Sequence, residues 1–140
     1  METKMDHQKL RTAGLKITAP RMKILELLEN ADPHHLSAED VYRILREADH
    51  DVAFATIYRV LTQFEEAKLI KRHNFEGGRS VFELEKHEHH DHLVCISCNR
   101  VEEFVDEVIE AHQLEIAKKK KFRLTDHNLT IYGVCEKCDQ

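Results

Sequence analysis

Histidines and cysteines are concentrated in one short stretch, HEHHDHLVCISC, at residues 87–98. Four histidines fall within six positions of it, and a Cys-x-x-Cys pair follows almost at once. Neutral imidazoles and thiolates are side chains that bind transition metals. The stretch therefore predicts metal binding. Three kinds of site have to be distinguished: a catalytic centre, a structural clip and a sensor of metal concentration.

The cysteines form two Cys-x-x-Cys pairs, Cys95 with Cys98 and Cys135 with Cys138. Each pair makes a turn in which two sulfur atoms converge. Four thiolates satisfy tetrahedral Zn²⁺ and leave no open position, which is typical of a structural site. The alternatives are four free cysteines or a redox-active pair. The redox pair is disfavoured because neither pair opens a helix after a strand. The spacing thus predicts a structural zinc clip.

The histidines alternate along what the pattern indicates is a strand. On a strand, His90 and His92 point to one face, whereas His89 and Asp91 point to the other. Glu103, across the Cys-x-x-Cys turn, can meet the first pair, and Glu110 and His127 can reach the second. Glu83 and the His34–His35 pair lie farther upstream. Mixed imidazole and carboxylate donors suit Fe²⁺, Mn²⁺, Co²⁺, Ni²⁺ or Zn²⁺. Isolated histidines, such as His7, His50 and His73, are expected to be surface residues.

An enzyme is the alternative for these histidines, because HEHHDH fits the H-x-H-x-D-H ligand pattern of metallo-β-lactamase-fold hydrolases. That fold needs a much longer chain with further distant ligands. The sequence also has no HExxH motif, and no proline precedes either Cys-x-x-Cys as it does in zinc deaminases. We therefore expect no enzymatic activity and no catalytic residues.

Length and composition indicate a cytoplasmic protein of one ordinary domain or two small ones, 140 residues in all. The sequence has no apolar run long enough to cross a membrane and no signal peptide. In the reducing cytoplasm, paired cysteines favour metal over disulfides. The net charge of −5 lies mostly in residues 85–140, which hold 8 basic and 12 acidic residues against 13 and 14 in residues 1–84. Binding of divalent metal would offset that excess.

The N-terminal half predicts three helices followed by a hairpin. Residues 1–10 are expected to form a mobile tail. Thr18 and Ser37 are predicted N-caps of the first two helices, and the third spans ATIYRVLTQFEEAKLI. Two strands around the Gly77–Gly78 turn complete a winged helix-turn-helix. No acidic residue occurs at residues 53–64, and the exposed arc of the third helix carries Thr56, Tyr58, Arg59, Thr62 and Gln63. Such a surface suits a recognition helix beside phosphates.

The C-terminal half predicts a strand pair around Cys95–Cys98, one helix ending near residue 121, and one or two further strands. The predicted fold class is α+β, with an N-terminal winged helix-turn-helix domain at residues 1–84 and a small α/β dimerisation domain at residues 85–140. About 50 residues bury little core alone, and an unpaired strand edge favours self-association.

Five motifs together resemble the ferric uptake regulator family. They are GLKITAPRMKILELL, SAEDVYR, ATIYRVLTQFEEAKLI, HNFEGGRSVFEL and HHDHLVCISC, and the resemblance covers residues 10–138. The iron-responsive members match better than their zinc- or peroxide-sensing relatives. The resemblance implies a regulatory metal site at His35, Glu83, His90, His92 and Glu103, and a second site at His89, Asp91, Glu110 and His127. It implies structural zinc at Cys95, Cys98, Cys135 and Cys138, and DNA contacts from Lys16, Thr56, Tyr58 and Arg59.

The resemblance also implies a function: an Fe²⁺-responsive transcriptional repressor that binds A·T-rich palindromic operators of iron-uptake genes as a homodimer. Mn²⁺, Co²⁺ or Zn²⁺ would be able to replace Fe²⁺ at the regulatory site. The sequence leaves open a zinc-, manganese- or peroxide-responsive member of the same family, a metal buffer, and the pairing of dimers into tetramers. Because the implied ligands come from both halves, a bound metal would set the angle between them.

Overall fold

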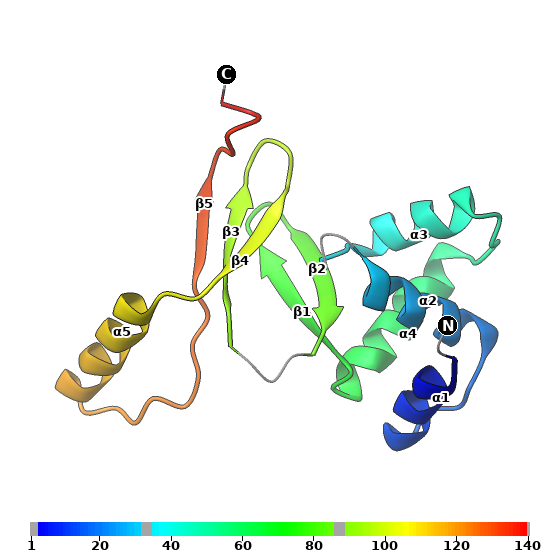
Figure 1. The fold of residues 1–140 in the computed structure, drawn as a ribbon, viewed down its shortest axis with the longest axis horizontal. Coiled ribbons are helices and arrows are strands. Elements are labelled where there is room, and N and C mark those ends of the chain that lie inside the picture. Colours follow the sequence, from blue (N-terminus) through cyan, green and yellow to red (C-terminus); the bar gives the residue numbers. More distant parts are fainter. Residues whose placement is uncertain (1–2, 32–34, 86–88, 140) are drawn as a thin grey trace. The chain divides into compact units, whose positions relative to one another are not determined.

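The computed structural model describes residues 3–31, 35–85 and 89–139. The chain divides into two compact units, Met1–Lys86 and His87–Gln140 (Figure 1). The sequence predicted a boundary between residues 84 and 85. The structure places the division just after the last strand of the first unit, β2 (Arg79–Leu84).

Four helices lead the first unit: α1 (Thr3–Thr12), α2 (Ala19–Asn30), α3 (Ala38–Glu47) and α4 (Phe54–Glu66). The Thr18 side chain caps α2 by accepting a hydrogen bond from the Arg21 backbone N–H. Ser37 and Asp40 form a reciprocal capping box at the start of α3. Both N-caps were predicted from the sequence, because their side-chain oxygens satisfy backbone N–H groups that a helix leaves unpaired in its first turn.

The core of the first unit is a single apolar cluster to which all four helices contribute. Helix α4 buries Ile57, Val60, Leu61 and Phe64, on the side opposite the arc that the sequence predicted to be exposed. The expectation of a mobile N-terminal tail is wrong. Helix α1 packs against α2 and buries Leu10 completely. A helix of ten residues is marginal in isolation, and burial of one face stabilises it.

The wing is an antiparallel hairpin of β1 (Ile70–Phe75) and β2. Gly77 and Gly78 have φ angles of 90° and 78°, in the left-handed region that glycine tolerates best, so the predicted turn is confirmed. A short β-bridge then ties the segment before α3 to this hairpin. The Leu36 N–H donates to the Phe82 carbonyl at 3.0 Å, and the Phe82 N–H donates back at 2.7 Å.

The second unit is a three-stranded sheet with one helix. Its strands are β3 (Asp91–Cys95), β4 (Val101–Phe104) and β5 (Thr130–Gly133), in the order β4-β3-β5. Strand β3 pairs antiparallel with β4 and parallel with β5. Helix α5 (Glu107–Lys119) lies between β4 and β5 in the chain, begins at the Asp106 cap and ends in a run of lysines. Lysines there suit the negative end of the helix dipole.

The second unit has a very small core. Its buried apolar residues, among those described, are Val94, Cys95 and Val101. Helix α5 has no buried residue. Large apolar side chains lie exposed instead, including Val108 and Phe122, at 66% and 73% exposure. So little burial predicts that this unit needs metal or self-association for stability. None of the described helices of the chain is long and apolar enough to cross a membrane.

Candidate metal centres and nucleic-acid interface

The four cysteines converge in the second unit. Cys95 ends β3, Cys98 lies in the turn after it, and Cys135 and Cys138 follow β5. The parallel pairing of β3 with β5 brings the two turns together. The Ile96 N–H donates to the Gly133 carbonyl at 2.8 Å, and the Cys98 and Cys135 sulfur atoms lie 3.8 Å apart. All four sulfur atoms lie within 4.8 Å of one another, a spacing that a single tetrahedral cation can bridge with small adjustments.

Backbone amides prepare these sulfur atoms for a cation. The N–H groups of Cys135, Cys98 and Ser97 donate to Cys95 Sγ and lower the pKa of that thiol to about 6. Hydrogen bonds shared with the Cys135 and Cys98 thiols raise the pKa of Cys138 to about 12. Without a cation, the Cys138 thiol therefore keeps its proton at neutral pH. Zn²⁺ fits this donor set because it binds thiolates and displaces that proton.

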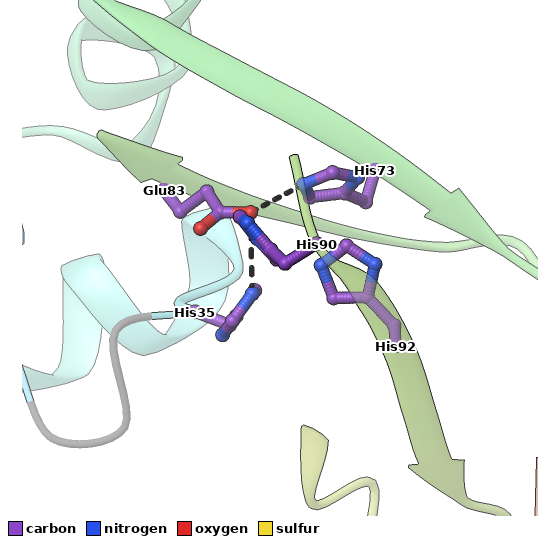
Figure 2. A group of neighbouring side chains, drawn as sticks. All are labelled: His35, His73, Glu83, His90 and His92. Carbon is purple, nitrogen blue, oxygen red and sulfur yellow. Dashed lines mark hydrogen bonds and ion pairs between the residues drawn. The ribbon is translucent and has the colours of Figure 1, made fainter. Parts of the chain in front are cut away.

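In the first unit, His35, His73 and Glu83 form a buried polar cluster (Figure 2). His35 Nε2 lies 3.3 Å from Glu83 Oε2, and His73 Nε2 lies 2.5 Å from the same oxygen. The side chains of His35 and Glu83 are 2% and 1% exposed. Two imidazoles and a carboxylate are suitable ligands for divalent transition metals.

In the second unit, a separate set of donors lies at the start of β3. His92 stands opposite Glu103 in the β3–β4 register. His90 Nε2 lies 3.4 Å from Glu103 Oε2. The rings of His90 and His92, drawn in Figure 2, are 4.9 Å apart between centroids. The structure thus brings together three of the five residues of the expected regulatory site on this unit. The other two, His35 and Glu83, come together on the first unit.

The other expected set, His89, Asp91, Glu110 and His127, also comes together within the second unit. His89 Nε2 lies 2.9 Å from Asp91 Oδ1 and 3.5 Å from Glu110 Oε2. His127 Nε2 lies 3.2 Å from that same glutamate oxygen. Asp91 is fully buried, and its Oδ2 has no hydrogen-bond partner among the described residues. An orphaned carboxylate oxygen is costly to bury, so the cluster fits a cation as a further partner.

The expected nucleic-acid surface lies on the first unit. Tyr58 and Arg59 are exposed on α4, and Thr56 is half-buried at its first turn. Lys16 is exposed on the loop before α2. The guanidinium group of Arg21 links the two regions, because it donates to the Lys16 carbonyl at 2.7 Å and to Gln63 Oε1 on α4 at 2.9 Å.

A second arginine links the wing to the same helix. Arg72 on β1 donates to the Tyr58 hydroxyl at 3.2 Å and lies 5.5 Å from the centre of its ring. Its guanidinium group also lies 3.1 Å from the Glu65 carboxylate. Helix α4, the wing and the Lys16 loop are therefore held in fixed relative positions, as recognition of a duplex requires.

The sequence model of the ferric uptake regulator family matches residues 12–132. The chain is 62% identical over 133 residues to the ferric uptake regulation protein of Legionella pneumophila, a match that covers 95% of this chain and 98% of that protein. The chain belongs to the ferric uptake regulator family.

Solved members of the ferric uptake regulator family share its architecture. The crystal structure of the Vibrio cholerae ferric uptake regulator matches with a TM-score of 0.87 and 52% identity, over 91% of this chain and 98% of that chain. The Francisella tularensis ferric uptake regulator with iron matches with a TM-score of 0.86 and 39% identity, over 91% and 96%. The predicted fold class, an N-terminal winged helix-turn-helix domain followed by a small α/β domain, is confirmed.

One isolated histidine differs from expectation. His73 was expected on the surface, but it is half-buried against Glu83. Its place follows from the hairpin register, in which His73 pairs with Val81 and so lies diagonal to Glu83 on the same face. His34 and His87 lie outside the described residues.

Proposed function

We propose that the chain is a metal-dependent transcriptional repressor, activated by Fe²⁺, that binds A·T-rich palindromic operators of iron-uptake genes as a homodimer. One observation carries the proposal. The winged-helix unit holds His35 and Glu83, whereas the second unit holds His90, His92 and Glu103. Neither set alone fills the coordination shell of a metal that takes five or six ligands.

The mechanism follows from this division of donors. A metal that completes its shell with ligands from both units restrains the angle between them. In a dimer, that angle sets the separation of the two α4 helices, and major-groove half-sites lie about 34–36 Å apart or multiples of it. Changing the population of the binding-competent state from 1:99 to 99:1 takes about 5.5 kcal/mol of differential metal affinity. Fe²⁺ binding by five protein ligands is an adequate source of that energy.

Structural Zn²⁺ on Cys95, Cys98, Cys135 and Cys138 belongs to the same proposal. Structural zinc contributes about 10–16 kcal/mol of apparent binding energy in small domains. The small apolar core of the second unit supports a need for it. We assign a further divalent cation to His89, Asp91, Glu110 and His127. The support is the buried Asp91 Oδ2, which has no hydrogen-bond partner among the described residues.

Homodimer formation is assigned to the second unit. Exposed apolar side chains lie on α5, such as Val108 and Leu114, and Ile131 on β5 is also exposed. Strand β5 is an edge of the described sheet. Exposed apolar surface and an open strand edge both favour association with an identical chain.

DNA binding is assigned to the first unit. Tyr58 and Arg59 on α4 are proposed to contact bases and backbone in the major groove, with Thr56 at the start of the helix. Lys16 is proposed to enter an A·T-rich minor groove, where the negative potential is enhanced. The absence of acidic residues at residues 53–64 supports this assignment, since the surface meets phosphates without repulsion.

The deciding experiment measures operator binding at fixed salt, with and without Fe²⁺. The unsubstituted chain is compared with the double variant His90→Ala, Glu103→Ala. If only about 1% of the chain is competent without regulatory metal, the double variant in Fe²⁺ binds operator about 100-fold more weakly than the unsubstituted chain. Glu102→Ala is the matched control, because this neighbouring carboxylate is half exposed and pairs with Arg100.

The outcomes separate the candidate functions. Equal Fe²⁺-dependent affinity in the double variant and the unsubstituted chain contradicts the proposed mechanism. A response to Zn²⁺ or Mn²⁺ at free concentrations where Fe²⁺ has no effect indicates a regulator of another metal. Metal binding with no salt-sensitive DNA binding indicates a buffer.

A further inference from the structure

We propose that His35, His73 and Glu83 form a three-ligand binding site for a divalent transition cation that lies wholly within the winged-helix unit. His73 is the added ligand, and the site binds its cation without any donor from the second unit. The inference deepens the proposed function, because it rests on His35 and Glu83 serving in the regulatory site.

The geometry carries the first step. Both imidazoles lie within reach of one carboxylate oxygen: His73 Nε2 is 2.5 Å and His35 Nε2 is 3.3 Å from Glu83 Oε2 (Figure 2). The three ligand atoms lie within 4.8 Å of one another. Ligands 2.0–2.2 Å from a shared metal are about 3.0–3.5 Å apart, so a cation needs shifts of only about 1 Å.

Backbone hydrogen bonds position the segments that carry the three side chains. His73 and Glu83 lie on the two strands of the wing, in a register that puts them on one face. His35 immediately precedes Leu36, whose N–H and C=O both bond to Phe82, the neighbour of Glu83. The three side chains are therefore carried by hydrogen-bonded backbone. This favours tight binding, because little conformational entropy of the backbone is lost when the cation binds.

Burial and charge carry the second step. The Glu83 side chain is 1% exposed, and that of His73 is 11% exposed. A carboxylate buried this deeply is stabilised by a close positive partner. A cation bound by all three side chains supplies that partner. Two imidazoles with one carboxylate make the ligand set that proteins use for Fe²⁺ with open coordination positions.

Those open positions distinguish this site from the complete regulatory site. A cation held by three ligands of the winged-helix unit keeps room for His90, His92 and Glu103. The first unit can then capture the cation, and the second unit can join afterwards. The cation would therefore bind first to the winged-helix unit.

The test is a Co²⁺ titration of the zinc-loaded full-length chain, followed by the visible absorption of the bound cobalt. The background variant removes donors of the second unit, so that Co²⁺ bound at the wing can be observed alone. It carries alanine at His89, His90, His92, Glu103 and His127. We expect it to retain Co²⁺ binding at the wing. Adding His73→Gln is expected to weaken that binding by about tenfold or more.

Two matched variants control for indirect effects. His73→Asp keeps a metal-ligating atom, so we expect it to restore most of the affinity that His73→Gln loses. His50→Gln removes another imidazole of the same unit and is expected to change nothing. In the Co²⁺-loaded chain without background substitutions, His73→Gln should also remove one paramagnetically shifted imidazole N–H resonance. That measurement remains available if the background variant fails to fold.

Two results would overturn the inference: no Co²⁺ bound at the wing of a folded background variant, or equal affinity and equal resonances with and without His73→Gln. Operator binding separates this failure from failure of the proposed function. If the unsubstituted chain binds operator only with Fe²⁺ while the cobalt results are negative, the repressor function stands and the three-ligand site does not. If it binds no operator, the repressor function fails, and the cobalt titration still decides the site.

Discussion

The capping box of α3 allows a quantitative prediction that joins stability to the metal site. The Asp40 N–H donates to Ser37 Oγ, and the Ser37 N–H donates to Asp40 Oδ2, both at 3.0 Å. Ser37 is buried and follows directly after His35 and Leu36. Losing the Ser37 hydroxyl leaves a helix N–H without its acceptor, so Ser37→Ala should cost about 1 kcal/mol.

The expected change in melting temperature follows from this energy and from the size of the first unit. For a unit spanning Met1–Lys86, a change of 1 kcal/mol lowers Tm by about 4–8 °C. The measurement is thermal unfolding of the zinc-loaded protein by circular dichroism. Hydrogen exchange at the buried Val41 and Leu45 then assigns the loss to α3. Ser80→Ala, which removes an exposed hydrogen bond in the hairpin, should change stability by less than about 0.5 kcal/mol.

The same capping box predicts a dependence on pH. Burial raises the pKa of Asp40, but hydrogen bonds from Ser37 and the nearby Arg43 and Arg79 outweigh it and leave the pKa below its usual value. The stabilisation is therefore complete above the unfolded-state pKa of about 3.9 and is lost as pH falls through the lower folded-state pKa. Asp40→Asn should be less stable than the unsubstituted chain at neutral pH, and the difference should shrink below about pH 4.

Two results would refute this reasoning. One is a Ser37→Ala variant that melts at the same temperature as the unsubstituted chain. The other is an Asp40→Asn deficit that stays constant from pH 7 to acid conditions. Either would mean that the hydrogen bonds of the cap do not contribute net stability to the winged-helix unit.

Two further predictions concern the zinc cluster and the DNA surface. Cys98→Ser should abolish zinc binding and unfold the second unit, because about 10–16 kcal/mol of binding energy exceeds what its small core supplies. Zinc analysis with circular dichroism checks it, Ser97→Ala is the control, and a folded zinc-free variant would contradict it. Arg59→Ala should weaken DNA binding at every sequence and reduce the slope of log affinity against log salt by about one. Fluorescence anisotropy at several salt concentrations measures that slope, and an unchanged slope would exclude a phosphate contact.

Local patterns predicted the helices and strands of the chain well. The caps at Thr18 and Ser37, the buried stripe of α4 and the Gly77–Gly78 turn depend on residues close in sequence, so the sequence alone carries them. The alternation of HHDH likewise separated His90 and His92 from His89 and Asp91. These residues lie on or beside one strand, where successive side chains point to opposite faces.

Several features that depend on tertiary packing were not predicted. Leu10 is buried only because α1 finds a partner in α2, so the N-terminal segment gave no local sign of order. The burial of His73 was missed because its contact residue Glu83 is ten residues away, and only the hairpin register brings them together.

The central position of β3 makes its alignment decisive for all three clusters of the second unit. His92 contributes to one cluster, Asp91 to another and Cys95 to the third, within five consecutive residues. Side chains alternate between the faces of a strand, so sliding β3 by one residue against β4 and β5 would turn each donor to the wrong side. Insertions and deletions in the loop between α5 and β5 should be tolerated only where they leave His127 beside Glu110. A single residue inserted between His92 and Cys95 should disrupt at least one cluster of that unit, because the two ends of β3 cannot then both keep their register.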